Sequence, residues 1–341
     1  MRTMMISGLK HPTNPPIRKT LPLLAKVLAV INPAAGSFRK RKKLKPILRH
    51  LQLSASGLEI FYTAGAGDAT RLVREKKKEG WSLILCAGGD GTINEVINGM
   101  MQDGTQGGTQ DGTLHVLHAQ EGEGDLPPLA ILPTGTGNGL AREIGLPLNP
   151  WKAYTALLEG AARPIHLGRV HQRYFVLMGG VGFDAYVTDR VERRGGIFKK
   201  LPKLGVYLFS GLMALFSYRY PMIRFFVNGA SYEGTTGIVA KARLIAGPFV
   251  FAPRAEIDSP SLILCLMKSR GPWGYLWTLA NLFFLGRAGK GIEYVEGKRI
   301  EVAPAPAFIQ ADGEMVGAPP ALFTVSERPL YLIYPSPKRR A

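Results

Sequence analysis

Short apolar runs alternate with helical segments along the first half of the chain. The runs have the length and composition of buried strands, and they are residues 26–31, 58–62, 83–87 and 129–132. The segments 68–80 and 92–101 follow two of these runs and have the spacing of polar and apolar residues that helices show. Alternation of this kind predicts a parallel sheet with helices on its faces.

The pattern changes after Pro164. Short β-rich runs then dominate, separated by glycine and proline, as is typical of a β-sandwich. They are residues 174–178, 222–227, 236–245, 262–267, 299–302 and 307–310. We therefore expect an α/β domain over 26–160, completed by a return of the chain at about 322–336, and a β-sandwich domain over 161–321.

Two segments fit neither domain. Residues 1–25 are basic and contain several prolines, and we expect a flexible basic arm there. Residues 102–128 contain a nearly repetitive tract of Gly, Thr and Gln that cannot pack a core. Such a composition predicts a disordered surface insertion.

The chain is strongly basic, with a formal net charge of +18 over 341 residues. Nucleic acid, anionic lipid and a polyphosphate ligand all suit this charge, which alone does not select among them.

Two apolar stretches, residues 204–218 and 273–285, are too short to span a bilayer. Core helices are the commoner explanation for such stretches, and a surface at a membrane interface is the alternative. No secretion signal is expected, and Cys86 and Cys265 are expected to be buried thiols.

Glycine-rich turns follow the predicted parallel strands. Residues 88–92 (Gly-Gly-Asp-Gly-Thr) and 133–138 (Pro-Thr-Gly-Thr-Gly-Asn) each lie between an apolar run and a helical segment. A turn of this kind presents backbone N–H groups at the start of a helix, which suits a phosphate group. Similar turns at 32–37 and 63–68 follow the other two strands, and ligands of open α/β sheets bind at this edge. Neither a Walker A loop nor a G-x-G-x-x-G motif is present.

Two acidic residues occur close together late in the chain, in Asp312-Gly313-Glu314. They would face the same side if the preceding strand continued, and one could then act as a base while the other orients it. Asp-Gly is also a common turn pair, and the pattern alone favours a hairpin turn. The basic run 39–43 could steer phosphate, although such a run is more often a solvated helix face.

The order of these motifs resembles the diacylglycerol kinase catalytic-domain family, which includes bacterial lipid kinases and sphingosine kinases. The resemblance extends from about residue 27 to residue 335. Gly-Gly-Asp-Gly-Thr alone is shared with NAD kinases, so the other motifs carry the specificity. These are Asn32-Pro33-x-x-Gly36, Thr63 with Gly67-Asp68-Ala69, Gly135-Thr136-Gly137-Asn138, the stretches 140–147 and 175–184, and Asp312-Gly313-Glu314.

The resemblance implies a phosphofructokinase-like nucleotide-binding domain, a C-terminal β-sandwich, and an active site in the cleft between them. It implies catalytic roles for Glu314, Asp312 and Asp90, with Glu314 as the proton acceptor. The implied metal ligands are Asp90 and Asp258. The residues implied to contact ATP are Asn32, Pro33, Gly36, Thr63, Gly88, Gly89, Asp90, Gly91, Thr92, Asn94, Gly135, Thr136 and Asn138.

The chain departs from the family pattern at two places. Gly139 stands where the family commonly has Asp, which removes one polar contact. Residues 258–263, Asp-Ser-Pro-Ser-Leu-Ile, correspond to a family run, Asp-Asp-Gly-Leu-x-Asp, that binds a structural Mg²⁺. Of the carboxylates in that run, this chain retains only Asp258.

The expected function is that of an ATP- and Mg²⁺-dependent lipid kinase, which transfers the γ-phosphoryl group to the hydroxyl of a lipid alcohol of the diacylglycerol or sphingoid-base type. A soluble NAD kinase and a non-catalytic nucleotide- or lipid-binding pseudokinase are the alternatives. The expected partners are nucleotide and a lipid substrate at a membrane surface, not nucleic acid, and a homodimer is left open. We expect a cytoplasmic protein at the inner face of the membrane, because the basic charge suits an anionic surface.

Overall fold

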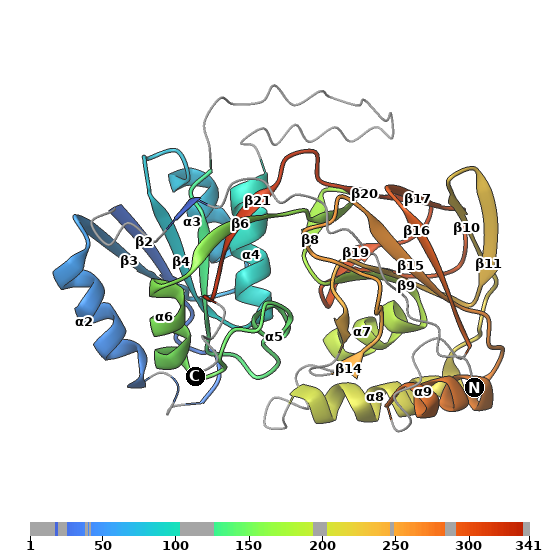
Figure 1. Ribbon diagram of the computed structural model, residues 1–341. Helices are drawn as coiled ribbons and strands as arrows, with labels where there is room; N and C mark the ends of the chain where they lie inside the picture. The colour runs from blue at the N-terminus through green and yellow to red at the C-terminus, as the bar shows by residue number, and fades with distance from the viewer. Residues whose placement is uncertain are drawn as a thin grey trace, which may run out of the picture.

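The computed structural model describes residues 18–19, 26–37, 40, 42–102, 126–193, 203–245, 249–283 and 291–336. Most of the expected basic arm and most of the expected insertion lie outside the described residues. Two regions lie side by side, an α/β region and a sheet-rich region (Figure 1).

A seven-stranded sheet forms the centre of the α/β region. Its order is β1 (Arg18–Lys19), β6 (Ala161–Ile165), β21 (Leu330–Tyr334), β5 (Leu129–Pro133), β4 (Leu83–Gly88), β2 (Lys26–Ile31) and β3 (Gly57–Tyr62). Strands β2 to β5 are parallel, as the alternating pattern predicts. The helices of this region are α2 (Leu44–Ser54), α3 (Asp68–Lys76), α4 (Asp90–Met101), α5 (Gly139–Glu143) and α6 (Pro150–Leu158).

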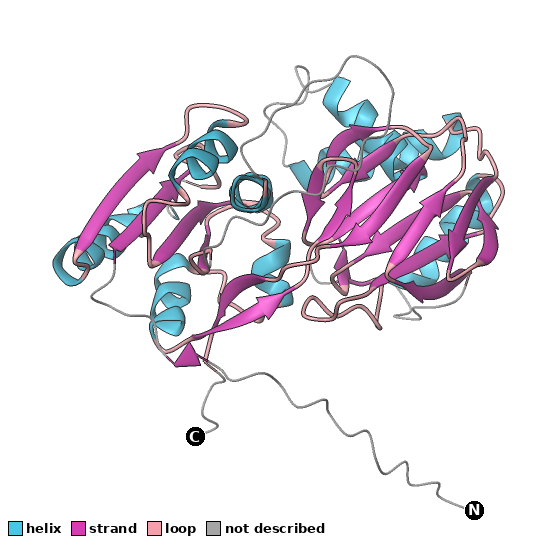
Figure 2. Cartoon of the chain, turned by 90° about the horizontal axis from the view of Figure 1, so that it is seen from above, coloured by secondary structure: helices cyan, strands magenta, loops and turns pink. Residues whose placement is uncertain are grey.

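The central strands of this sheet are apolar throughout because helices cover both of its faces (Figure 2). All six residues of β4 and all five of β5 are buried. Parallel strands covered on both sides show this continuous pattern in place of alternation. The helix α2 buries Leu44, Ile47 and Leu51, which recur with helical spacing on the face that packs on the sheet.

Two six-stranded antiparallel sheets form the sheet-rich region. The first has the order β11 (Ala230–Gly234), β10 (Ile223–Val227), β17 (Arg299–Val302), β20 (Ala321–Val325), β7 (Gly168–Val170) and β8 (Arg173–Phe175). The second has the order β16 (Ile292–Gly297), β15 (Leu262–Met267), β12 (Thr236–Ala240), β9 (Met178–Gly182), β18 (Ile309–Ala311) and β19 (Glu314–Gly317). The remaining elements are α7 (Phe183–Arg193), α8 (Lys203–Ser217), α9 (Pro272–Phe283), β13 (Leu244–Ile245) and β14 (Phe249–Val250).

The two sheets of this region pack face to face around one shared apolar cluster. A Cβ atom on Gly237 in the second sheet would lie 2.4 Å from the ring of Phe225 in the first. The glycine therefore makes room for the ring, and Gly179 does the same for Phe323. This contact between layers is the packing of a β-sandwich.

The chain passes between the regions at 166–167 and again at 326–329. The first crossing lies a few residues after the predicted boundary at 160, because β6 belongs to the first sheet. The return lies after the predicted position of about 322, because β20 belongs to the sheet-rich region. The partners of β6 and β20 are distant in the sequence, so the local pattern does not reveal which sheet each strand joins.

Among the residues that the structure describes, no helix combines the length and the apolar character needed to cross a bilayer. Cys86 and Cys265 are buried free thiols, as expected. Burial raises the pKa of both thiols, and such thiols are unreactive at neutral pH.

Candidate active site

Three of the four glycine-containing turns meet at the carboxyl ends of the parallel strands. The N–H of Gly135 donates to the carbonyl of Gly88 at 3.3 Å, which ties the turn after β5 to the turn after β4. A Cβ on Gly135 would lie 2.4 Å from Cα of Gly89, and a Cβ on Gly36 would lie 1.7 Å from the carbonyl oxygen of Thr134. No side chain fits in these contacts, so the glycines let three backbones approach one another.

The turn after β2 is also bonded to the start of α4. The side-chain amide of Asn32 donates to the hydroxyl of Thr92 at 2.9 Å, and its oxygen accepts from the N–H of Ala34 at 2.9 Å. The helix α4 follows directly on Gly89, which supplies no capping side chain. The first N–H groups of a helix have no intrahelical acceptor, so this end of α4 suits an anionic ligand.

The carboxylate of Asp90 is mostly buried and faces the start of α5. It accepts from the N–H of Leu140 at 3.4 Å. Burial raises the pKa of Asp90, and the N–H groups of Leu140 and Gly139 oppose that shift. A Cβ on Gly139 would lie 3.6 Å from a carboxylate oxygen of Asp90, so the departure at this position removes a side chain beside Asp90.

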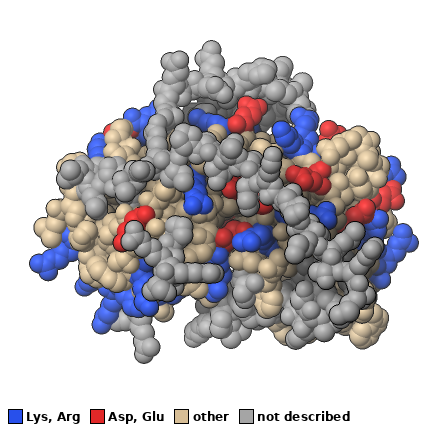
Figure 3. Space-filling view, in the orientation of Figure 1, with Lys and Arg blue, Asp and Glu red and all other residues tan. Residues whose placement is uncertain are grey.

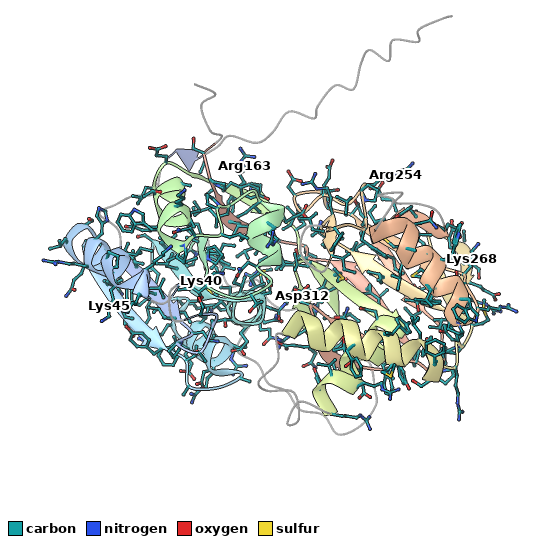
Figure 4. The ribbon with its side chains drawn as sticks, turned by 90° about the horizontal axis from the view of Figure 1, so that it is seen from below. Lys40, Lys45, Arg163, Arg254, Lys268 and Asp312 are labelled. Carbon is teal, nitrogen blue, oxygen red and sulfur yellow. The ribbon has the colours of Figure 1, made fainter. Side chains whose placement is uncertain are left out.

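Two cations lie beside the turn after β5, and neither was among the predicted site residues. The ammonium of Lys40 donates to the carbonyl of Gly135 at 2.7 Å, and Nε of Arg142 donates to the carbonyl of Gly137 at 3.1 Å. Burial lowers the pKa of Lys40, and the charge of Arg142 lowers it further. Figure 4 shows Lys40 in the α/β region on the side that faces Asp312. The basic run 39–43 was the signal that could have identified Lys40.

The turn after β3 is held by its own acidic residue. The carboxylate of Asp68 accepts from the N–H groups of Ala64 and Gly65 at 2.8 and 2.9 Å, and these bonds lower the pKa of Asp68. Thr63, at the start of this turn, is buried. The side chain of Glu95 accepts from the N–H of Ala69 at 3.2 Å, which links α4 to the start of α3.

One flank of α4 joins the α/β region to the sheet-rich region. The side-chain amide of Asn94 donates to the carboxylate of Asp312 at 2.8 Å and to the carbonyl of Tyr174 at 3.1 Å. Asn98, one helical turn later, donates to the same carbonyl and accepts from the N–H of Tyr174 at 2.9 Å. Asn98 was not predicted, although its spacing of four residues from Asn94 places both amides on one face of the helix.

Asp312 and Gly313 form the turn of the hairpin β18–β19, with φ values of 47° and 85°. The strand therefore does not continue through them, and the hairpin turn that the Asp-Gly pattern favours is confirmed. The carboxylate of Asp312 instead accepts from the N–H groups of Val176, Leu177 and Met178 at 2.7 to 3.0 Å, in addition to the amide of Asn94. Burial raises the pKa of Asp312 to about 6, and these donors oppose the shift.

A second buried carboxylate supports the same turn. The side chain of Gln310 accepts from the N–H of Gly313 at 2.7 Å and donates to the carboxylate of Asp184. Burial raises the pKa of Asp184, and the bond from Gln310 opposes the shift. A Cβ on Gly180 would lie 2.2 Å from the Asp184 carboxylate, so the glycine-rich stretch of β9 makes room for it.

The carboxylate of Glu314 is more open than that of Asp312. Its side chain is 40% exposed and forms an ion pair with Arg173. Burial raises the pKa of Glu314, and the charge of Arg173 opposes this shift. The charges of Glu95 and Glu192 raise it further. Of the two carboxylates of this hairpin, that of Glu314 is the more open, whereas that of Asp312 already accepts from four donors.

The loop that contains Asp258 is built around a lysine. The ammonium of Lys241, which is fully buried, donates to the carbonyls of Glu256, Ser259 and Ser261 at 3.0, 2.5 and 3.2 Å.

Within the described part of the chain, no three His, Cys, Asp or Glu side chains are arranged to hold a metal ion. An open hollow of about 880 Å³ lies between β10, β16 and β17, and its lining contains none of the predicted site residues.

Comparison with known proteins agrees with the motifs. The family model for the diacylglycerol kinase catalytic domain matches residues 26–170. A diacylglycerol kinase of Bacillus subtilis is 26% identical over 315 residues, which cover 91% of this chain and 96% of that protein. A protein of Pseudomonas aeruginosa named "Probable lipid kinase YegS-like" is 31% identical over 287 residues, covering 82% of this chain and 85% of that protein.

The fold agrees as well. The crystal structure of a diacylglycerol kinase from Bacillus anthracis superposes with a TM-score of 0.68 at 23% identity, covering 91% of this chain and 97% of that one. The similarity spans both regions, whereas the family model covers mainly the α/β region. The chain therefore belongs to the diacylglycerol kinase catalytic-domain family.

Proposed function

We propose that this protein uses ATP and Mg²⁺ to phosphorylate the hydroxyl group of a lipid alcohol, between the α/β region and the sheet-rich region. Family membership supports phosphoryl transfer, and the relatives named above include a diacylglycerol kinase and a lipid kinase. The observation that carries the proposal is helix α4. Its first turn begins at the glycine turn, and its Asn94 is bonded to Asp312 of the acidic hairpin. One rigid helix therefore fixes the distance between an anion site and a carboxylate hairpin.

The converging turns would bind the nucleotide phosphates. The start of α4 and the turn after β5 lie against each other, and Lys40 and Arg142 add positive charge beside the second turn. Phosphoryl transfer depends mainly on positioning and on neutralising charge, which these groups supply.

Asp90 would hold Mg²⁺ together with the nucleotide. The donor set fits, because Mg²⁺ is commonly bound by one or two carboxylates and by phosphate oxygens, and Asp90 lies between the two glycine turns. The ion would neutralise charge on the transferred group.

Glu314 would accept the proton of the lipid hydroxyl. The hydroxyl oxygen forms a bond to the γ-phosphorus, the bond from that phosphorus to the bridging oxygen breaks, and ADP leaves. Glu314 is the accessible carboxylate, whereas Asp312 is a positioning residue whose oxygens are already occupied by four N–H donors. Asp312 would hold the hairpin, and therefore Glu314, in place.

The test is a kinase assay with labelled ATP, Mg²⁺ and a panel of diacylglycerol, monoacylglycerol, ceramide, sphingosine and polyprenol in mixed micelles, with NAD as a further acceptor. We expect label in one lipid class and its loss in Glu314→Gln. The matched control is Glu301→Gln in β17, an exposed carboxylate paired with Arg299, which should retain activity. Label in NAD alone would favour an NAD kinase, and ATP binding without any transfer would favour a pseudokinase.

A further inference from the structure

Two helices of the sheet-rich region carry their apolar side chains on the outside. In α8 the exposed residues are Phe209, Leu212, Met213 and Phe216, which recur at the spacing of one helix face. In α9, Trp273 and Trp277 are 74% and 54% exposed. We call these six residues the apolar face.

Other positions of the same helices are buried, and some of them are polar. Ser210 of α8 is buried, and so are Thr278 and Asn281 of α9. A helix of a globular protein normally buries its apolar stripe and exposes its polar one. In the described parts of α8 and α9 the large apolar residues of the apolar face instead point to solvent, which indicates a surface with a partner.

The six residues form one continuous surface. The rings of Phe216 and Trp273 are in contact, with centroids 6.3 Å apart. The two helices lie along the lower edge of the sheet-rich region in Figure 1 and face the viewer in Figure 4. The strand β14, which packs next to α9, adds the exposed residues Phe249 and Val250.

The stretch of sequence that contains both helices is basic, which favours an anionic partner. Residues 193–292 contain fourteen Lys and Arg and only three Asp and Glu, which accounts for most of the net charge of +18. Neither α8 nor α9 contains an acidic residue. Arg219 and Arg270 are exposed and lie two residues from the ends of α8 and α9. Figure 3 shows basic side chains on both regions of the molecule.

We propose that the apolar face inserts into the interface of an anionic lipid bilayer, with Arg219 and Arg270 at the headgroups. Tryptophan and phenylalanine flanked by cations are the composition of interfacial helices. A second copy of the chain is disfavoured, because a two-fold contact would bring the same cations together. The proposal rests on the proposed function, since a kinase whose substrate is a membrane lipid must reach that lipid.

The experiment is sedimentation of the full chain with vesicles of phosphatidylcholine, with and without phosphatidylglycerol. We expect binding to the anionic vesicles that weakens at high salt, and a loss of about tenfold or more in Trp273→Ser/Trp277→Ser. The matched control is Trp151→Ser, an exposed tryptophan on α6, which should bind as the original chain does. Arg219→Glu/Arg270→Glu should weaken binding to vesicles that contain phosphatidylglycerol and leave binding to pure phosphatidylcholine vesicles unchanged.

Other results would overturn the docking surface. These are equal binding by the double tryptophan variant, no binding by the original chain, and a dimer in light scattering that the double variant abolishes. Circular dichroism establishes that each variant is folded. A short-chain, water-soluble diacylglycerol separates the two proposals. If the double variant phosphorylates it normally, docking alone is lost, and if the original chain binds vesicles without phosphorylating any lipid, the proposed function fails while docking stands.

An independent inference concerns the loop of Asp258. The resemblance implies a structural metal there, yet the carbonyls of Glu256, Ser259 and Ser261 already accept from the ammonium of Lys241. A fixed positive charge among these oxygens repels a divalent cation. We infer that Lys241 serves as the internal cation of this loop, so that the loop folds without a bound metal.

Thermal unfolding of the full chain tests this inference. The melting temperature should be the same with EDTA and with Mg²⁺ or Ca²⁺ in the absence of nucleotide. Lys241→Met leaves three buried carbonyls without their donor and should lower it by about 5 °C or more, whereas Lys152→Met, on the exposed side of α6, should not. A melting temperature of the original chain that rises with either ion, or that falls with EDTA, would contradict it.

Discussion

In the α/β region three of the glycine turns are in direct backbone contact, whereas in the sheet-rich region two loops are each held by one buried charge. Gly36, Gly89 and Gly135 allow three turns to touch. In the other region, Asp312 collects N–H groups from three successive residues of one turn, and Lys241 collects three carbonyls of another. The first arrangement should fail when volume is added, and the second when charge is removed.

Removal of the Asp312 charge should have the largest effect. Asp312→Ala leaves the N–H groups of residues 176–178 without their acceptor, which should lower the free energy of unfolding by about 3 kcal/mol or more, since each unsatisfied buried donor costs about 1–3 kcal/mol. Chemical denaturation measures this. Asp189→Ala, which breaks a surface pair whose Arg193 side chain is 72% exposed, should change it by less than about 1 kcal/mol. Equal stability of the two variants would mean that the charge does not hold the hairpin.

Addition of volume to the α/β turns should have the next largest effect. Gly135→Ala places a methyl against Gly89 and should cost about 1–3 kcal/mol of stability, with a large loss of ATP affinity in calorimetric titration. Gly65→Ala has open space around the new methyl and serves as the control. If both variants bind ATP like the original chain, the contact between turns does not shape the nucleotide site.

A smaller effect is expected from Lys40, the cation that donates to the turn after β5. Lys40→Met should raise the KM for ATP by about tenfold with a lesser change in kcat, because a charged hydrogen-bond donor is lost beside the phosphates. Lys45→Met, on an exposed position of α2, is the control in the same steady-state assay. An unchanged KM for ATP would exclude Lys40 from the nucleotide site.

The smallest effect should be a shift in pH dependence. As a proton acceptor, Glu314 must be ionised, so activity should fall as the pH drops through its raised pKa. The charge of Arg173 opposes that rise, so Arg173→Met should raise the pKa of Glu314 further and move the acid limb of the pH–rate profile to higher pH. An acid limb that stays in place, or moves to lower pH, would exclude Glu314 as the titrating group.

The parallel strands and their glycine turns could be predicted because both signals are local. An apolar run followed by glycines and a helical segment contains all the information that its own conformation needs. The contact of Asn98 with Tyr174 could not be predicted, because the two residues are 76 positions apart. A hydrogen bond between distant residues produces no periodic pattern in the sequence. The role of Lys241 could not be predicted either, because the residue lies inside the predicted apolar run 236–245, whereas the strand ends at Ala240.

Asp312 and the apolar face show a different kind of ambiguity. Asp-Gly is compatible with a turn and with a catalytic pair, and the structure combines a turn with a buried carboxylate. The apolar stretches in α8 and α9 were compatible with core and with membrane contact. Each helix has a buried side and an exposed apolar side, and the amino-acid composition does not indicate which side packs against the rest of the protein.

The position of β21 has a consequence for how this chain folds during synthesis. Residues 330–334 lie between β5 and β6 in the interior of the first sheet. Strands β5 and β6 are therefore synthesised well before the strand that pairs with both of them, and the sheet-rich region is synthesised in between. Until then the nascent chain exposes the edges of β5 and β6, which is the stage at which a chaperone would have most to protect.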